Sequence, residues 1–195
     1  MNQQRWILLD RDGVINEESS EYIKSPEEFI FIPGSLEAIV KLTQAEFKIV
    51  IITNQAGIGR GLFSLESLMQ IHAKLTRQIE QAGGSLTDIF FCPHHPNQDC
   101  LCRKPKPGLI HQFAQTYQID LHKTTPFFVG DSLRDIIAAQ VAHCVPILVK
   151  TGNGAKTLLD NSIETKKRLS STLVFENLAK TVDHLLSEKN MNGEY

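Results

Sequence analysis

The sequence predicts an α/β fold in which a mostly parallel sheet is covered by helices on both faces. Short apolar runs alternate along the chain with longer segments that carry apolar residues at helical spacing, which is the pattern of strand–helix–strand units. These runs are apolar throughout, as expected for strands that are buried on both faces. Polar residues follow several runs directly, and in parallel sheets ligands bind at that carboxyl edge.

The 195-residue chain is long enough to bury a substantial core. We expect one domain over residues 1–189 and a disordered tail over 190–195. A formal net charge of -2 without any basic run argues against a nucleic-acid partner. Neither a signal-peptide pattern nor a membrane-length apolar stretch is visible, so a cytoplasmic protein without a membrane partner is expected. We also expect the protein to be a monomer.

The first expected strand covers residues 6–9 and ends in Asp10-Arg11-Asp12-Gly13. Two carboxylates one residue apart repel each other unless a cation lies between them, so the pair suits a hard cation with oxygen ligands. Gly13 allows the backbone to turn sharply out of the strand. A strand followed by a plain polar turn would give the same short motif.

Two strands and a helix are expected next. A polar segment over 16–28 precedes the apolar run 29–32, which predicts a short strand. Pro33-Gly34-Ser35 opens a helix whose apolar residues, up to residue 47, share one face. The run over 48–52 predicts a second buried strand, which ends in Thr53-Asn54-Gln55.

The segment 56–61 is rich in glycine and is expected to be a mobile loop at the mouth of the site. Its spacing is not that of a phosphate-binding P-loop, because the Gly-Lys-Ser/Thr ending is absent. Ser64 occupies the position of an N-cap for the next helix, which Gly83-Gly84 should end.

The second half of the chain continues the alternation. Strands are expected over 87–92, 125–129 and 145–149. Helices are expected over 107–118, 133–142 and 175–186, with loop and one short helix over 151–172. The strand at 125–129 ends in Gly130-Asp131-Ser132, although Asp131 could equally cap the helix that comes next.

The polar strand ends combine groups that phosphoryl transfer requires. Three carboxylates, Asp10, Asp12 and Asp131, suit Mg²⁺ and leave positions for phosphate. An Asp at the centre can act as the nucleophile, and a second Asp can protonate the leaving oxygen and later activate water.

Donors to phosphate come from two further segments. Thr53 and Asn54 offer a hydroxyl and an amide, unless they only cap a helix. Arg103 and Lys104 offer positive charge for the other side of a phosphate. A solvated surface lysine is the alternative for Lys104.

A second metal is indicated by the loop over 92–108. Its first part has the ligand types of a closed tetrahedral zinc site, with ligands Cys92, His94, Cys100 and Cys102. Clustered cysteines without an export signal indicate a metal rather than disulfides. We prefer His94 to His95, because the ligands then form one Cys-x-His pair and one Cys-x-Cys pair, at the two ends of the loop. The alternative to a zinc site is a loop with three reduced cysteines. Zinc would position the adjoining Arg103 and Lys104.

Four segments together resemble the motifs of the haloacid dehalogenase (HAD) superfamily, in order and across most of the chain. They are Asp10-Arg-Asp-Gly with Asn16, Thr53-Asn-Gln, Lys104, and Gly130-Asp131-x-x-x-Asp135. The resemblance implies a three-layer Rossmann-like fold, with Asp10 as nucleophile and Asp12 as general acid/base. It further implies that Thr53 and Lys104 stabilise the phosphoryl group. Mg²⁺ would be held by Asp10, the backbone carbonyl of Asp12, and Asp131.

The resemblance also carries an expectation about the substrate. Short connections leave no room for a large cap domain, so we expect an open, capless site for a small phosphorylated substrate. Its binding residues are expected to be Asn54, Gln55, Arg103 and Ser132.

The zinc loop resembles two related groups of capless phosphatases. One acts on a heptose bisphosphate of lipopolysaccharide biosynthesis and the other on histidinol phosphate. The segment 53–61 and Val149-Lys-Thr-Gly are more similar to the first group, which favours a phosphorylated sugar. The segment 17–21 departs from that group and keeps only the following Tyr22. A non-catalytic binding module stabilised by zinc is the alternative from another class.

Overall fold

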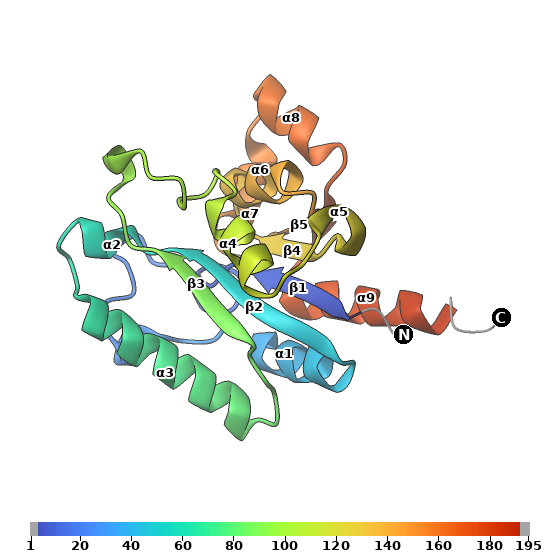
Figure 1. Ribbon diagram of the computed structural model, residues 1–195, viewed down its shortest axis with the longest axis horizontal. Coiled ribbons are helices and arrows are strands. Elements are labelled where there is room, and N and C mark those ends of the chain that lie inside the picture. Colours follow the sequence, from blue (N-terminus) through green and yellow to red (C-terminus); the bar gives the residue numbers. More distant parts are fainter. Residues whose placement is uncertain (1–3, 192–195) are drawn as a thin grey trace.

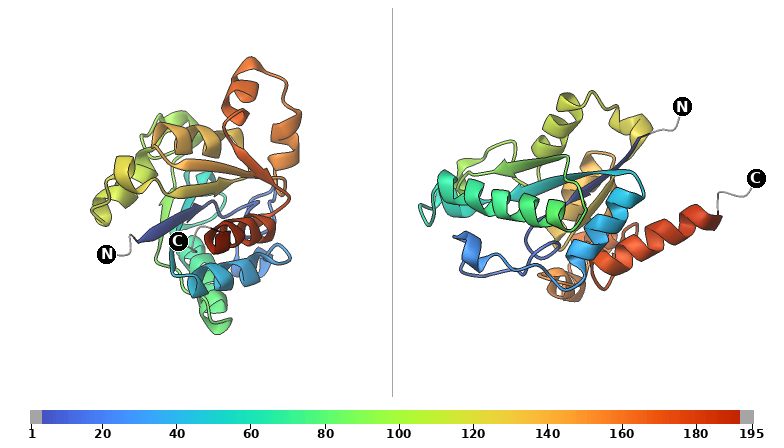
Figure 2. Two further views of the ribbon diagram at one scale, coloured as in Figure 1. Left: turned by 90° about the vertical axis from the view of Figure 1, so that its right-hand side faces the viewer. Right: turned by 90° about the horizontal axis from the view of Figure 1, so that it is seen from below.

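The computed structural model describes residues 4–191, apart from the side chains of 188–191. A six-stranded sheet lies at the centre with helices on both faces (Figure 1 and Figure 2). The strand order is β3-β2-β1-β4-β5-β6, and all neighbouring strands are parallel. The predicted parallel α/β sheet is confirmed.

Five of the six strands lie close to the predicted positions. The strands are β1 (Arg5–Leu9), β2 (Phe47–Asn54), β3 (Asp88–Cys92), β4 (Phe127–Gly130), β5 (Val145–Val149) and β6 (Leu173–Phe175). The strand β6 was not predicted. It is a three-residue strand at the edge of the sheet with exposed Leu173 and Val174, so it lacks the apolar burial that marks the others.

Each face of the sheet has its own apolar layer, because successive residues of a strand point to opposite faces. In β1, Ile7 and Leu9 belong to one layer, while Trp6 and Leu8 belong to the other. The first layer is covered by α1 (Ser35–Gln44), α3 (Leu65–Gln81) and α9 (Leu178–Met191), and the second by α4 (Gly108–Thr116) and α6 (Leu133–Val141) (Figure 1). These are the three layers that the resemblance implied.

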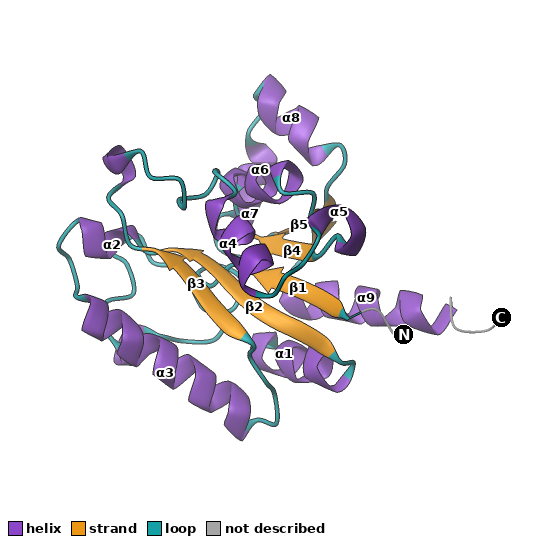
Figure 3. Cartoon of the chain, viewed as in Figure 1, coloured by secondary structure: helices purple, strands orange, loops and turns teal. Residues whose placement is uncertain are grey.

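The remaining helices are short and lie in the connections (Figure 3). They are η1 (Pro26–Glu28), α2 (Ala56–Gly59), η2 (Pro96–Gln98), α5 (Leu121–Thr124), α7 (Gly154–Leu159) and α8 (Ile163–Leu169). No further domain is inserted within residues 4–191. In that range no helix is both long and apolar enough to cross a membrane.

Several local predictions are corrected. Residues 29–32 are not a strand: Phe29 and Ile32 are buried against the core, and only Phe31 forms an isolated bridge, to Asn16. The segment 56–61 begins with the one-turn helix α2 instead of a loop, and the region 151–172 holds two short helices. The last helix extends to Met191, so residues 190–191 of the predicted tail are helical and 192–195 lie outside the described residues.

The strand order places a ligand-binding crevice between β1 and β4. From β1 the chain adds β2 and β3 on one side and then returns to add β4, β5 and β6 on the other. Such a reversal opens a crevice beyond the carboxyl ends of the two strands. Asp10 follows β1 and Asp131 follows β4, so both carboxylates lie at this crevice.

Candidate active site

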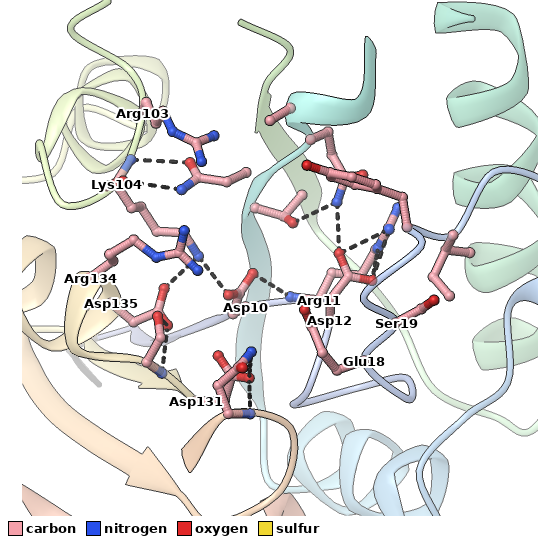
Figure 4. Close-up of a pocket in the computed structure, with 18 of the residues that line it drawn as sticks. Asp10, Arg11, Asp12, Glu18, Ser19, Arg103, Lys104, Asp131, Arg134 and Asp135 are labelled. Atoms are coloured by element: carbon pink, nitrogen blue, oxygen red, sulfur yellow. Dashed lines mark hydrogen bonds and ion pairs between the residues drawn. The ribbon is translucent and has the colours of Figure 1, made fainter. Parts of the chain in front are cut away.

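The carboxylate of Asp10 is fixed at the end of β1 by two contacts. Its Oδ1 accepts a hydrogen bond of 2.7 Å from the backbone N–H of Arg11, and its Oδ2 lies 2.8 Å from Lys104 Nζ. The backbone N–H of Asp10 donates to the carbonyl of Val129, which ties β1 to β4 at the crevice. The predicted nucleophile is therefore held in one orientation (Figure 4).

The ammonium group of Lys104 is buried among three acceptors. Besides Asp10, Nζ lies 2.6 Å from Asp135 Oδ1 and donates to the carbonyl of Ile52 at 2.8 Å. Only 2% of the Lys104 side chain is exposed. The predicted lysine thus crosses from the zinc loop to the carboxylates, and the surface alternative is wrong.

Asp131 is enclosed by two glycines and an asparagine. A Cβ at Gly13 or at Gly152 would lie 2.2 Å from Asp131 Oδ2, and both glycines have positive φ, so no larger residue fits either position. Asp131 Oδ2 accepts hydrogen bonds from the backbone of Asn153 at 2.7 Å and from its side chain at 3.2 Å. The alternative that Asp131 caps α6 is wrong, because Ser132 is the N-cap.

The carboxylate of Asp12 is turned toward a different set of partners. Arg11 Nη2 donates to both of its oxygens at 2.8 Å and 2.9 Å, and Asn16 and Gln55 each donate one bond of 2.9 Å. Arg11 itself is 1% exposed and lies 3.4 Å from Nε2 of the buried His72. Burial alone would raise the pKa of Asp12, but Arg11 and these donors hold that pKa below its usual value.

The other carboxylates carry more negative charge than Lys104 can balance. Burial, with the charges of Asp135 and Asp131, raises the pKa of Asp10 to about 8 despite Lys104. Burial and Asp135 likewise raise the pKa of Asp131 to about 7. Asp135 differs, because Lys104 and Ser132 outweigh its burial and lower its pKa. A divalent cation at this point would favour the ionised forms of Asp10 and Asp131.

The donor set fits Mg²⁺. One carboxylate oxygen each of Asp10, Asp131 and Asp135 lies within 4.8 Å of the others, close to the span of about 4.2 Å between opposite ligands of an octahedral Mg²⁺. Asp135 already binds Lys104 with Oδ1, and Ser132 donates two bonds to its Oδ2. Asp10 is engaged in a similar way by Lys104 and by the N–H of Arg11, and Asp10 and Asp131 stay the predicted side-chain ligands.

These groups form one side of a cavity of about 210 Å³. Glu18 and Ser19, from the segment after the Asp dyad, lie on the side away from Lys104 (Figure 4), and Tyr22 also lines the cavity. Burial and the charges of Asp12 and Asp10 raise the pKa of Glu18 to about 7. Arg103 and Arg134 also line the cavity. Thus Lys104, Asp135 and the two arginines lie on one side of Asp10, and Asp12, Glu18 and Ser19 lie on the other (Figure 4).

Three of the four predicted substrate-binding side chains are already engaged within the protein. Asn54 accepts from the backbone N–H of Lys104 and donates to its carbonyl, both at 3.1 Å. Gln55 donates to Asp12 and to Thr53, and Ser132 donates to Asp135. All three line the cavity and also orient neighbouring site residues, and a direct contact of theirs with the substrate stays a prediction.

The predicted zinc ligands converge. The Sγ atoms of Cys92 and Cys100 are 3.5 Å apart, and His94 Nδ1 is 3.1 Å from Cys102 Sγ and 3.6 Å from Cys92 Sγ. Tetrahedral zinc would place such atoms about 3.6–3.8 Å apart. Three sulfurs and one imidazole at these separations fit Zn²⁺. His95 accepts from the N–H of Asn97 and caps η2, which supports the choice of His94.

The prediction gave no role to three residues that the structure places at the site, Asp135, Asn153 and Arg134, and it treated Glu18 only as part of an acidic run. Asp135 belongs to the motif after β4, so the sequence contained its signal. Nothing in the local pattern distinguishes Asn153, because its contact with Asp131 spans 22 residues. Glu18 and Arg134 look like ordinary surface charges until the fold brings them to the cavity.

The fold and this site define a phosphatase of the HAD-like class. A family model described as polynucleotide kinase 3 phosphatase matches residues 7–172, and the chain belongs to this family.

Comparison with individual proteins gives a closer grouping. The chain is 48% identical over 182 residues to the D-glycero-beta-D-manno-heptose-1,7-bisphosphate 7-phosphatase of Bordetella bronchiseptica, covering 93% of this chain and 98% of that protein. It is 44% identical over 180 residues to the same-named protein of Pseudomonas aeruginosa, covering 92% and 97%. A crystal structure of the B. bronchiseptica phosphatase with magnesium and phosphate matches with a TM-score of 0.87 over 95% of this chain and 99% of that one.

Proposed function

We propose that this protein is a Mg²⁺-dependent phosphatase that removes the 7-phosphate of D-glycero-β-D-manno-heptose 1,7-bisphosphate, a step toward the nucleotide-activated heptose of lipopolysaccharide. For the reaction, the supporting observation is Asp10 held by Lys104 beside Asp131 in an open cavity. For the substrate, the support is the name shared by relatives that are 44–48% identical over almost the whole chain.

In the first half of the reaction, Asp10 attacks phosphorus and forms an aspartyl-phosphate while the bond from phosphorus to the sugar oxygen breaks. The leaving oxygen takes a proton from Asp12. In the second half, Asp12 removes a proton from water, which attacks the same phosphorus and frees Asp10. Lys104 and Thr53 stabilise the charge on the transferred group.

The surroundings of Asp12 favour the form that the second half needs. Its pairing with Arg11 favours the carboxylate, which is the base. The first half needs the acid, and the negative charge of an arriving phosphate next to Asp12 favours its protonation. Arg11, Asn16 and Gln55 then hold the residue between the two steps.

Two metals belong to this proposal. Mg²⁺ would be held by Asp10, Asp131 and the backbone carbonyl of Asp12, and when bound it neutralises charge on the phosphoryl oxygens. Zn²⁺ would be held by Cys92, His94, Cys100 and Cys102 and would have a structural role. Arg103 and Lys104 directly follow the last zinc ligand, so the zinc loop would fix the backbone position from which these two side chains extend.

A substrate panel tests the function. We expect phosphate release from the β-anomer of the heptose bisphosphate with kcat/KM at least about tenfold above that for histidinol phosphate, a difference of about 1.4 kcal/mol. The α-anomer and p-nitrophenyl phosphate complete the panel. A higher kcat/KM for histidinol phosphate would overturn the substrate assignment, and no release from any phosphate ester would overturn the enzyme itself.

Arg103 should matter for the far end of the substrate. The heptose bisphosphate and p-nitrophenyl phosphate each present one phosphate to the phosphoryl site. Only the bisphosphate has a second phosphate that the planar guanidinium of Arg103 can bind. Arg103→Ala is expected to lower kcat/KM for the heptose bisphosphate roughly tenfold more than for p-nitrophenyl phosphate. Equal losses on both substrates would place Arg103 in support of the phosphoryl site only.

A further inference from the structure

A second arginine stands beside Arg103 at the outer part of the cavity. Arg134 is the second residue of α6 and lines the active-site cavity together with Arg103. Both arginines also line an adjacent hollow of about 240 Å³ against the zinc loop. Figure 4 shows them on the side of the cavity that carries Lys104. Two guanidinium groups from separate elements therefore border the same two spaces.

Neither arginine has a carboxylate partner. Among the ion pairs within residues 4–191, Arg11, Lys104 and Lys106 each have an acid, whereas Arg103 and Arg134 take part in none. Arg103 Nη1 is buried without a hydrogen-bond acceptor. Two close cations without an anion repel each other, so this pair gains most from an anionic ligand.

The acids of the neighbourhood do not fill this role. Asp135, next to Arg134 in sequence, is buried and binds Lys104 and Ser132. Asp99, at the outer hollow, is paired with Lys106. Glu18 lines the same cavity and its charge interacts with that of Arg134, but the two form no ion pair among those found within residues 4–191. One carboxylate thus stands against two arginines, so positive charge remains in excess at the outer end, while negative charge is in excess at the inner end around Asp10 and Asp131.

We propose that Arg134 acts with Arg103 to bind the outer phosphate of a bisphosphate substrate, and that the adjacent hollow extends the active site. This inference rests on the proposed function, because it takes the heptose bisphosphate as the substrate. A phosphate accepts two parallel hydrogen bonds from a guanidinium, so two arginines can hold its oxygens in a defined orientation. Arg134 is then a determinant of specificity for bisphosphates over monophosphates.

The test compares kcat/KM for the heptose bisphosphate with kcat/KM for p-nitrophenyl phosphate in Arg134 variants. Arg134→Ala should lower this ratio about tenfold, which corresponds to about 1.4 kcal/mol. Arg134→Lys should restore the ratio in part, because a lysine keeps the positive charge but lacks the planar guanidinium that forms two parallel hydrogen bonds. Lys156→Ala is the matched control: it removes one exposed positive charge from α7, borders neither space, and should leave the ratio unchanged.

Product inhibition gives a second measurement. Heptose 1-phosphate keeps only the outer phosphate, so its inhibition constant against p-nitrophenyl phosphate should rise about tenfold in Arg134→Ala. Inhibition by inorganic phosphate, which binds at the inner end, should change much less. If the wild type prefers the bisphosphate and Arg134→Ala changes neither the ratio nor the inhibition by heptose 1-phosphate, the inference is wrong while the function stands. If the wild type shows no preference for the bisphosphate, the proposed function fails and the inference with it.

Discussion

At the inner end of the cavity, Lys104 lies against three acceptors, and the carboxylates of Asp12 and Asp135 are bound by neighbouring donors. At the outer end, Arg103 and Arg134 have no ion pair among the described residues, and Glu18 lines the opposite side of the cavity. The two ends differ in how far the protein satisfies its own polar groups.

This difference separates catalysis from recognition. Groups that act on the transferred phosphoryl are fixed in advance, so little reorganisation is needed when the reaction occurs. Groups that would contact the rest of the substrate keep unsatisfied charge until an anion arrives. Changes at the inner end should therefore affect every phosphate ester, and changes at the outer end should discriminate between esters.

The largest effect is expected at the inner end. Asp10→Asn keeps the shape of the side chain but removes the nucleophile, so turnover of both the bisphosphate and p-nitrophenyl phosphate should fall by at least about 1000-fold. Circular dichroism and a thermal melt check that the fold is intact. Asp183→Asn, a surface carboxylate paired with Lys41, is the matched control and should keep full activity. Activity of Asp10→Asn within about tenfold of the wild type would refute the assignment.

The zinc loop carries both Lys104 of the inner end and Arg103 of the outer end. Loss of zinc should therefore affect substrate recognition more than the chemical step. Lys104 is additionally held by Asn54, Ile52 and two carboxylates, whereas the side chain of Arg103 forms no hydrogen bond or ion pair among those found within residues 4–191. Cys100→Ser should lower zinc content from about one per chain, lower the melting temperature, and raise KM for the bisphosphate several-fold more than it lowers kcat.

Elemental analysis, thermal melts and steady-state kinetics measure these three effects. Cys144→Ala is the control, because Cys144 is buried away from the cluster and its loss should leave zinc content unchanged. Wild-type protein without zinc would contradict the prediction. A collapse of kcat at unchanged KM would show instead that zinc supports the inner end.

The parts of the site that the sequence predicted are those with a local signal. Asp10 and Asp131 stand where apolar strands end, and the zinc ligands lie within eleven residues of each other. Strand positions followed from burial, which local composition reflects. The prediction was wrong where burial and strand pairing do not coincide. Residues 29–32 include buried side chains but form no strand, and β6 is a strand with exposed side chains.

The parts that could not be predicted depend on contacts across the chain. The amide of Asn54 was expected at the phosphate, but the fold places the backbone of Lys104, fifty residues later, against it. Ser132 was likewise assigned to substrate, while the turn into α6 directs its hydroxyl to Asp135. An arginine without a partner, such as Arg134, cannot be recognised from sequence, because its isolation is a property of the folded neighbourhood.

The smallest expected effect concerns charge at the inner end and the stabilisation by Mg²⁺. In the folded protein the pKa values of Asp10 and Asp131 are raised from 3.8 to about 8 and about 7. The folded state therefore binds these protons more tightly than the unfolded state. Their contribution to the free energy of unfolding is complete below about pH 4 and is lost as the pH rises through 7 to 8. Asp12 and Asp135, with lowered pKa values, act oppositely but only at acid pH.

Because Mg²⁺ binds the ionised carboxylates, protons compete with it at low pH. The gain in unfolding free energy on adding Mg²⁺ should be larger at about pH 8 than at about pH 5.5, by about 1–2 kcal/mol. Thermal melts at both pH values measure it, with Mg²⁺ removed by dialysis, because a strong chelator would also remove zinc. Asp10→Asn should reduce the difference, since one of the two raised carboxylates is gone. Equal gains at both pH values would show that charge at the inner end is balanced without the cation, and the contrast between the two ends would then rest on hydrogen bonding alone.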